Sequence, residues 1–351
     1  PMYYIKNGLG RHWQFLAVLY SLFGVLTVFG TGNATQVNTI VTAIDSALLA
    51  YGSSLNSILP TVNLVVGVVV AMMVAMVLLG GVKRIGSATE KLVPFMALFY
   101  VVLALGVVVI NYRRFPAVLA SIVGGAFDPQ AFTGGAIGSI FLSMQKGVSR
   151  GIFSNEAGLG SAAISAAAST TDDPARQGYV SMTGTFIDTI IVCTITGLTI
   201  ASSGVLGTVG PDGKPLAGVE LTMAAFSTHI GTAGSWIVSI GIMLFAYSTI
   251  LGWEYNGEKA WEYLWGTHKY NIIYRLVFSL VVYVGATQTL DLVWNLSDIA
   301  NALMAIPNLI SMLILAPVIK EEVLRFEAVI AKEKVERKAA LPEKNEEILH
   351  I

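Results

Sequence analysis

The fold of this chain is decided by sixteen residues, Lys146 to Ser161, which read KGVSRGIFSNEAGLGS. They lie in the middle of an apolar run from Gly134 to Ala168, which would form a helix about 52 Å long at 1.5 Å per residue. The hydrocarbon layer of a bilayer is only about 30 Å thick. Glycine costs about 1 kcal/mol per helical position, and charges at membrane depth cost more. The sequence therefore predicts non-helical backbone within Gly151–Gly158, near the middle of a membrane.

The composition is that of an integral membrane protein. Of the 351 residues, 54% are hydrophobic and 12% are charged, whereas soluble domains carry about 25% charged residues. Fifteen of the charged residues lie in residues 320–351, which leaves the remainder still poorer in charge. The net charge of −1 argues against nucleic-acid binding. A single cysteine excludes a disulfide framework, and four scattered histidines do not indicate a metal centre.

Runs of about 20 mainly apolar residues are expected to cross the membrane as helices. The sequence contains eight such runs: Trp13–Gly30, Ile58–Gly80, Leu92–Ile110, Gly134–Ala168, Tyr179–Ala201, Gly231–Gly252, Asn271–Ala286 and Leu292–Pro317. We therefore expect an all-α integral membrane protein with eight transmembrane helices. One membrane domain covers residues 1–319, and residues 320–351 form a charged cytoplasmic tail.

Basic residues orient these spans, because cytoplasmic loops carry an excess of lysine and arginine. With eight spans, both termini lie on the same side, and that side holds 16 of the 21 basic residues. The opposite side holds only Arg113, Arg114 and Lys214. We expect both termini to be cytoplasmic and the protein to lie in the plasma (inner) membrane, with lipid as its surroundings and no protein partner.

The part of the quoted stretch from Arg150 to Ser161 resembles the alanine or glycine:cation symporter family, also called sodium:alanine symporters. The other segments that resemble this family are PMYYI at 1–5, GNATQVN at 32–38, GGVKRI at 80–85, VPFMA at 93–97 and GTFIDT at 184–189. The resemblance implies sodium-coupled import of a small neutral amino acid, alanine or glycine, with a sodium ion as the bound cation. It also implies the leucine-transporter fold, in which two inverted five-helix repeats each open with a broken helix.

On this resemblance, residues 12–110 are the last three helices of the first repeat, and residues 130–319 are the five helices of the second. The family motif begins with two glycines before PMYYI, and these are missing here. The resemblance therefore predicts an N-terminally truncated symporter, and residues 1–351 alone are not expected to transport. An inactive membrane fragment and a proton-coupled amino-acid transporter remain as alternatives, since Asp188 or Glu156 offers a titratable group.

The resemblance points to two places for the substrate, whose carboxylate needs donors and whose ammonium needs acceptors. Gln36, with Asn33 nearby, lies at the end of the first span, and the alternative is a polar helix end in the outer headgroups. Phe153, Ser154 and Asn155 lie in the predicted break. There Phe153 is expected to wall the side-chain pocket, while Ser154 and Asn155 contact ligand or ion.

Ser248 and Thr249 in the sixth span resemble the hydroxyl pair that holds a sodium ion in this fold. The alternative is that each hydroxyl bonds a carbonyl of the preceding helical turn. Asp188 and Glu156 are expected to have structural or coupling roles. Asp188 is expected to pair with Arg150 or Lys146, and Glu156 to accept hydrogen bonds from free amides of the break.

Three residues at the cytoplasmic end of the sixth span, Trp253, Glu254 and Glu258, are expected to form a solvated or gating face. An enzyme would need a nucleophile and base, or metal ligands, at a shared depth, and no such set is present in the spans. A channel would need rings of pore-lining residues from an oligomer, whereas this chain has one asymmetric broken helix. Secondary transport is therefore the function that the sequence favours.

Overall fold

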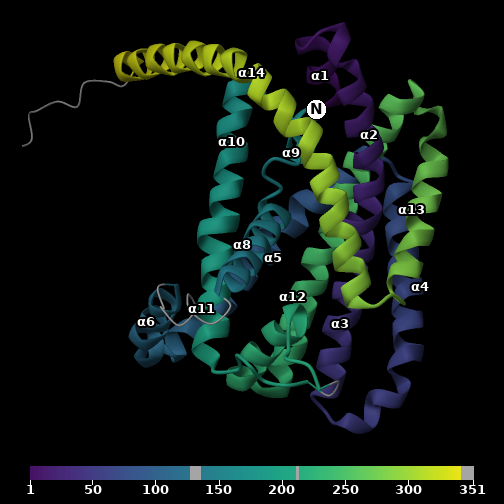
Figure 1. Ribbon diagram of the computed structural model, residues 1–351, viewed down its shortest axis with the longest axis vertical. Coiled ribbons are helices and arrows are strands. Elements are labelled where there is room, and N and C mark those ends of the chain that lie inside the picture. The colour runs from purple at the N-terminus through teal and green to yellow at the C-terminus, as the bar shows by residue number, and fades with distance from the viewer. Residues whose placement is uncertain (127–135, 211–212, 341–351) are drawn as a thin grey trace, which may run out of the picture.

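The computed structural model describes residues 1–126, 136–210 and 213–340, and almost all of them are helical (Figure 1). The helices of the first half are α1 (Met2–Gly8), α2 (Gln14–Phe29), α3 (Thr35–Leu49), α4 (Leu59–Leu78), α5 (Val82–Ile110) and α6 (Phe115–Ala126). Those of the second half are α8 (Ala136–Asn155), α9 (Ser161–Ala166), α10 (Pro174–Phe186), α11 (Cys193–Ser203), α12 (Gly218–Trp265), α13 (Asn271–Gly285) and α14 (Leu290–Ala340). The all-α class predicted from the sequence is confirmed.

Short irregular helical turns connect several of these helices. Two are π-helical turns, η2 (Gly30–Ala34) between α2 and α3, and η5 (Ile187–Val192) between α10 and α11. The others are the 3₁₀ turns η1 (Arg11–Trp13), η3 (Ser53–Ile58), η4 (Tyr112–Arg114) and η6 (His268–Tyr270). Since π-helical turns are rare and concentrate at functional sites, η2 and η5 mark two places where the helices of the described residues are locally distorted.

Six helical segments of the described residues are long and apolar enough to cross a membrane, so the chain is a multi-pass helical membrane protein. They are Arg11–Leu49, Ser54–Leu78, Arg84–Ile110, Pro174–Ser203, Gly234–Trp265 and Leu292–Glu336. The predicted fourth span is represented by α8 and α9, and its first residues lie outside the described residues. The predicted seventh span is α13, which has 15 residues. Neither belongs to the six.

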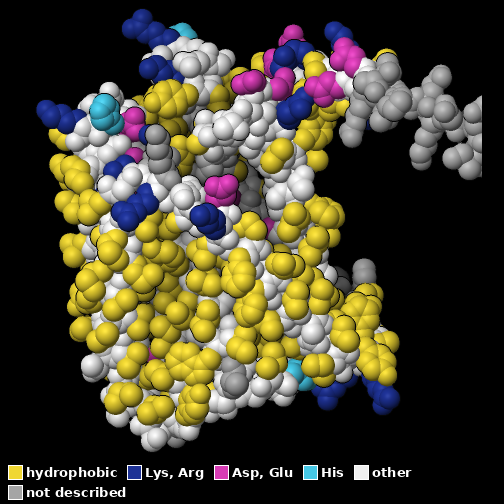
Figure 2. Space-filling model, turned by 180° about the vertical axis from the view of Figure 1, so that it is seen from behind, with side chains coloured by type: hydrophobic (Ala, Val, Ile, Leu, Met, Phe, Trp, Pro, Cys, Tyr) yellow, Lys and Arg dark blue, Asp and Glu magenta, His cyan; other side chains and the backbone are white. Residues whose placement is uncertain are grey.

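The surface agrees with a membrane location. Figure 2 shows a broad band of hydrophobic side chains around the middle of the molecule, with most of the charged side chains gathered above it. Exposed large hydrophobic residues lie on most of the long helices, for example Val69 and Met72 on α4 and Leu98 and Val102 on α5. In a soluble protein such a belt would favour aggregation, but in a bilayer it faces lipid.

The first span is longer than the sequence predicted. The prediction ended it at Gly30, but α2, η2 and α3 follow one another without a break from Gln14 to Leu49. The π-helical turn accommodates the extra residue and the glycines without breaking the helix. Gln36 and Asn33 therefore lie inside a long helix and are buried, so the expectation that they lie at a helix end is wrong.

Glycines allow α12 to approach this long helix closely. A Cβ atom at Gly32 would collide with Cβ and Cγ of Trp253 on α12. At Gly24 it would lie 3.4 Å from Cβ of Ala260, and at Gly257 it would lie 2.8 Å from a methyl group of Val28. Small residues that let backbones approach are the usual means by which membrane helices associate. The contact buries Trp253 of α12 and Val28 of α2.

The helix α12 is bent near its beginning. Gly231 has φ of 71° and ψ of −167°, which divides α12 into a short first part and a long second part. The second part runs to Trp265 and is longer than the predicted sixth span, which ended at Gly252. As a result Trp253, Glu254 and Glu258 lie within the helical bundle. Their exposed fractions are 3%, 0% and 2%, so the expected solvated face is wrong.

The charged end of the chain continues α14 as a helix up to Ala340 (Figure 1). It contacts the beginning of α10 through two ion pairs, between Arg325 and Asp173 at 2.9 Å and between Arg176 and Glu333 at 2.5 Å. Asp173 also caps α10, since its side chain accepts hydrogen bonds from the amides of Ala175 and Arg176. The part of the predicted tail that the structure describes is therefore an ordered helix.

The close approach of α2 and α12 leads to a stability prediction. Gly32→Ala is expected to lower the free energy of unfolding by about 1–3 kcal/mol, because the added methyl group overpacks against the base of the Trp253 side chain. Thermal unfolding of the detergent-solubilised protein measures the loss. Gly252→Ala is the matched control, since a Cβ there meets nothing within 4 Å. Equal melting temperatures for the two variants would contradict the packing.

Candidate functional site

The helix that carries the quoted motif is broken. α8 ends at Asn155, and the next five residues include three with positive φ: Glu156 at 57°, Gly158 at 83° and Gly160 at 81°. α9 then begins at Ser161. The predicted break within Gly151–Gly158 is confirmed, although Gly151 itself is still helical. Glycine adopts positive φ without steric cost, whereas a glutamate in this region is uncommon and typical of a constrained site.

The freed backbone groups of the break find partners in side chains. The side-chain oxygen of Asn155 accepts a hydrogen bond from the Ala157 amide at 2.9 Å. Asn308 of α14 donates its side-chain amide to the Gly158 carbonyl at 2.9 Å, and it accepts a hydrogen bond from the Tyr4 hydroxyl of α1. Non-helical backbone at membrane depth is tolerated only where protein or water satisfies it in this way. Asn308 thus ties three separate parts of the chain together.

Glu156 has a local partner in the break. Its Oε2 accepts a hydrogen bond from the Ser161 hydroxyl at 2.5 Å. The expectation was that Glu156 would accept from free backbone amides, but its hydrogen-bond partners are side chains, the Ser161 hydroxyl at the start of α9 and the Trp253 indole of α12. The carboxylate thereby connects the two sides of the break.

The π-helical turn η5 forms a second wall beside the break. Ser154 donates its hydroxyl to both carboxylate oxygens of Asp188, at 2.8 and 3.0 Å. The Asn155 side-chain amide donates to the Thr189 hydroxyl at 3.0 Å. Two consecutive residues at the end of α8 therefore bond two consecutive residues of η5. The Asp188 carboxylate is thereby bonded to the last turn of α8.

Arg150 pairs with a residue that the sequence analysis did not consider. Its Nη2 lies 2.5 Å from Oδ2 of Asp298 on α14, so the expected pairing of Arg150 with Asp188 is wrong. The guanidinium also lies over the Trp294 ring, 4.0 Å from its centroid. Phe153 packs on the other part of this cluster, with its ring centroid 4.6 Å from that of Trp294. The last turns of α8 are thus held to α14 by an ion pair and aromatic contacts.

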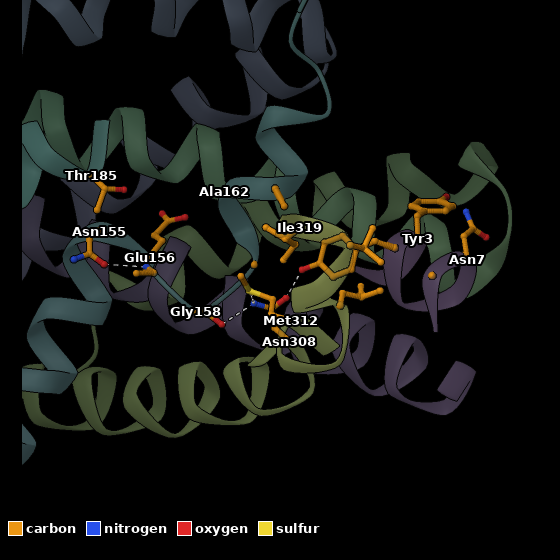
Figure 3. Close-up of a pocket in the computed structure, with 17 residues that line it drawn as sticks. Tyr3, Asn7, Asn155, Glu156, Gly158, Ala162, Thr185, Asn308, Met312 and Ile319 are labelled. Carbon is orange, nitrogen blue, oxygen red and sulfur yellow. Dashed lines mark hydrogen bonds between the residues drawn. The ribbon is translucent and has the colours of Figure 1, made fainter. Parts of the chain in front are cut away.

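A cavity of about 830 Å³ lies beside the break, between α1, α8–α9, α10 and α14. Figure 3 shows Asn155, Glu156 and Thr185 at one end and Tyr3 and Asn7 at the other, with Asn308 and Met312 between them. The volume falls in the range of about 300–1,000 Å³ typical of small-molecule pockets. Its walls are mainly apolar with a few polar side chains at both ends and in the middle, and a small number of placed polar groups is what orients a polar ligand.

The predicted substrate residues do not all meet at this cavity. Asn155 lines it, and Phe153 and Ser154 precede it on the last turn of α8. Asn33 faces α13, where its side-chain amide donates to the Phe278 carbonyl at 2.8 Å. Gln36, in the first turn of α3, donates to the Thr31 carbonyl of η2 at 3.1 Å. Gln36 and Asn33 do not line this cavity.

Ser248 and Thr249 both use their hydroxyl protons within α12. Each donates to the Phe245 carbonyl at 2.8 Å. This is the helix-internal bonding that the sequence left as the alternative. A hydroxyl that donates its proton still has lone pairs that can face a cation, so this geometry is compatible with either role.

Four residues of the site were missed: Tyr4, Trp294, Asp298 and Asn308. Asp298 could have been identified from the sequence, because an aspartate inside an apolar span is functional or paired by default. The sequence indication for Asn308 was weaker, since it is only a polar residue after Pro307 in the middle of the last span. The contacts of Tyr4 and Trp294 had no signal in the sequence, since aromatic residues are common throughout membrane helices.

A multi-pass membrane protein with a discontinuous helix beside a pocket has the construction of a secondary transporter. The chain belongs to the sodium:alanine symporter family, whose family model matches residues 1–340. This confirms the resemblance of the quoted motifs, and the family is one of transporters rather than enzymes.

Similar proteins occur in both bacteria and archaea. The chain is 45% identical over 325 residues to an uncharacterized transporter of Haemophilus influenzae, and 44% identical over 328 residues to the sodium/alanine symporter AgcS of Methanococcus maripaludis. It is 36% identical over 318 residues to the amino-acid carrier protein AlsT of Bacillus subtilis. These matches cover 92%, 93% and 91% of this chain, and 67%, 68% and 63% of the relatives. The chain thus spans about two thirds of their length.

The role of Asn308 can be tested directly. Asn308→Ala should leave the Gly158 carbonyl without its donor, at a cost of about 1–3 kcal/mol for an unsatisfied buried group. We expect faster deuterium uptake by peptides that cover residues 152–166, measured by mass spectrometry. Tyr4→Phe is the control, because it removes the other hydrogen bond of Asn308 and leaves the contact with Gly158. Unchanged exchange in Asn308→Ala would show that the break is held by other contacts.

Proposed function

We propose that the protein is a sodium-coupled symporter that imports a small neutral amino acid, alanine or glycine. The observation that carries this proposal is the break at Glu156–Gly160, whose polar side chains Asn155 and Glu156 line one end of the cavity. Exposed backbone carbonyls and amides at such a break are suited to a zwitterion and a sodium ion. Membership of the sodium:alanine symporter family supports the substrate class and the coupling ion.

We further propose that the chain adopts a leucine-transporter-like arrangement with eight transmembrane helices. In this arrangement residues 12–110 supply the last three helices of one repeat, and residues 130–319 supply the five helices of the other. The order of the second group supports it, since the broken helix α8–α9 is followed by α10–α11, α12, α13 and α14. The excess of basic residues on one side supports cytoplasmic termini in a plasma membrane.

Substrate is proposed to bind at the break, where Asn155 is the central residue. Asn155 lines the cavity, and its bond to Thr189 can be exchanged for one to a substrate carboxylate without unfolding either helix. Phe153 and Ser154 would contribute a wall and a hydroxyl. Asn33 of the π-helical turn η2 and Gln36 of the first turn of α3 are proposed to contribute as well, which requires Gln36 to leave its bond to Thr31. Glu156 and Asp188 are proposed to couple movement of the break to α9 and η5 through Ser161 and Ser154.

Because residues 1–351 alone are not expected to transport, the experiment for this function is uptake of labelled alanine into liposomes that contain the full-length symporter. An inward sodium gradient at equal pH on both sides is expected to drive accumulation, and labelled glycine is expected to compete. Accumulation driven equally by an inward proton gradient without sodium would instead favour the proton-coupled alternative. Competition by a large or charged amino acid, with none by glycine, would overturn the proposed substrate class.

A sodium site at Ser248 and Thr249 makes a separate prediction. Removal of one ligand oxygen by Ser248→Ala or Thr249→Ala should cost about 1–3 kcal/mol of sodium binding, and therefore raise the sodium concentration for half-maximal uptake by at least several-fold. Maximal uptake at saturating sodium should change less. Ser279→Ala of α13 is the matched control, because its hydroxyl also bonds a carbonyl of its own helix, that of Arg275 at 2.8 Å. The same sodium dependence in all three variants would show that Ser248 and Thr249 serve the helix only.

A further inference from the structure

Glu254 of α12 is a buried carboxyl group that none of the contacts above explains. Its side chain is 0% exposed, and neither Oε1 nor Oε2 has a hydrogen-bond partner among the residues that the structure describes. It lies in the middle of a segment, Gly234–Trp265, that is apolar enough to span a membrane. Burial of a polar group without a partner is costly, and burial of an unpaired charge is far more costly.

The nearest charged and titratable groups lie on α12 itself and on α13. They are Glu258 and Lys259 of α12, and Arg275 and Tyr274 of α13. The charged groups that act on Glu254 among the described residues are Glu258, Arg275 and Lys259, and on the side of α2 and η2 the close approaches at Val28 and Gly32 involve no ionisable group. A cation that could balance Glu254 would therefore have to be Arg275 or Lys259.

Both cations are already engaged by other carboxylates. Arg275 holds Glu258 with two hydrogen bonds, at 2.5 Å from Nε to Oε2 and at 3.1 Å from Nη2 to Oε1. Lys259 pairs with Glu262 at 2.7 Å. The Tyr274 hydroxyl is buried without a hydrogen-bond partner among the described residues, so it does not stabilise a charge on Glu254. A buried carboxyl group in such surroundings binds a proton instead of remaining ionised.

Glu254 is also the inner end of a stripe of carboxylates. Glu254, Glu258 and Glu262 are spaced four residues apart and therefore lie on one face of α12, about 6 Å apart along its axis. Glu254 is fully buried, and the Glu258 and Glu262 side chains are 2% and 27% exposed. Exposure thus increases toward the end of the helix at Trp265, which lies on the side predicted to be cytoplasmic. Glu254 therefore lies about two helical turns from a carboxylate that is partly exposed to solvent, that of Glu262.

We propose that Glu254 is a proton-binding site of this protein, occupied by a proton in the conformation described here. Glu254 is a different group from Glu156 of the break and from Ser248 and Thr249, and proton binding by Glu254 requires neither substrate nor sodium. It also does not rest on the proposed symport, because proton binding by Glu254 can occur in a protein that transports any solute.

Infrared spectroscopy of the purified protein tests the proposal without a transport assay. At neutral pH, without substrate and sodium, the wild type should show the carbonyl stretch of a protonated carboxyl group. Glu254→Gln should remove that band, or reduce it by the intensity of one carboxyl group if other protonated carboxyl groups contribute. Glu262→Gln is the matched control on the same stripe and should leave the band unchanged. An identical band in wild type and Glu254→Gln would overturn the proposal.

The pH dependence of stability gives a second, independent readout. A glutamate has a pKa of about 4.3 in an unfolded chain, so at neutral pH the unfolded protein releases the proton that folded Glu254 holds. Stability should therefore fall as pH rises above that value, with a contribution from this site of about tenfold in the unfolding constant per pH unit. Glu254→Gln should fold, match the wild type at pH values below about 4, and lack this contribution, so it should be more stable than the wild type at neutral pH. A large loss of stability in Glu254→Gln at neutral pH would show that the native group is a paired carboxylate and would overturn the proposal.

Discussion

The structure depends on one constraint: inside a membrane, every backbone group that leaves a helix must be bonded by another part of the protein. The break after Asn155 exposes such groups, and it persists because Asn155 and Asn308 bond them. Asn308 lies on α14 and is itself bonded by Tyr4 of α1. The first helix, the broken helix and the last long helix are therefore held in one arrangement, and the cavity lies where they meet.

Charged side chains inside the helical bundle likewise need a partner. Arg150 and Asp298 connect α8 to α14, and Glu258 and Arg275 connect α12 to α13. In each pair the charge is tolerated because a partner of opposite sign lies within hydrogen-bond distance. Glu254 departs from this pattern, which is why a proton is the simplest partner for it. The protein thus contains two kinds of polar feature, one around the break and one along α12.

Close helix packing determines where these features lie. The glycines at positions 24, 32 and 257 let α2 and α12 approach each other, and this contact buries the part of α12 that carries Trp253 and Glu254. On the opposite side of the molecule, η5 brings Asp188 and Thr189 to the end of α8. The π-helical turns η2 and η5 allow these helices to present polar side chains inward without ending.

The sequence by itself determined the class of the protein, the break and the family. Low charge content, long apolar runs and a glycine-rich polar interruption are properties of residues that are neighbours in the chain. They can be recognised without knowing which helices pack against each other. The motifs around Asn155 likewise depend on local sequence alone, and the family match agrees with them.

Only the tertiary structure determined which side chains pair with one another and which are buried. It paired Arg150 with Asp298 instead of Asp188, continued the first span through Gly30, and buried Glu254 where a solvated face was expected. Each of these outcomes depends on which helices cross and how closely. That geometry is set by contacts between residues far apart in the chain, such as Gly32 with Trp253, and hydropathy and spacing contain no information about them.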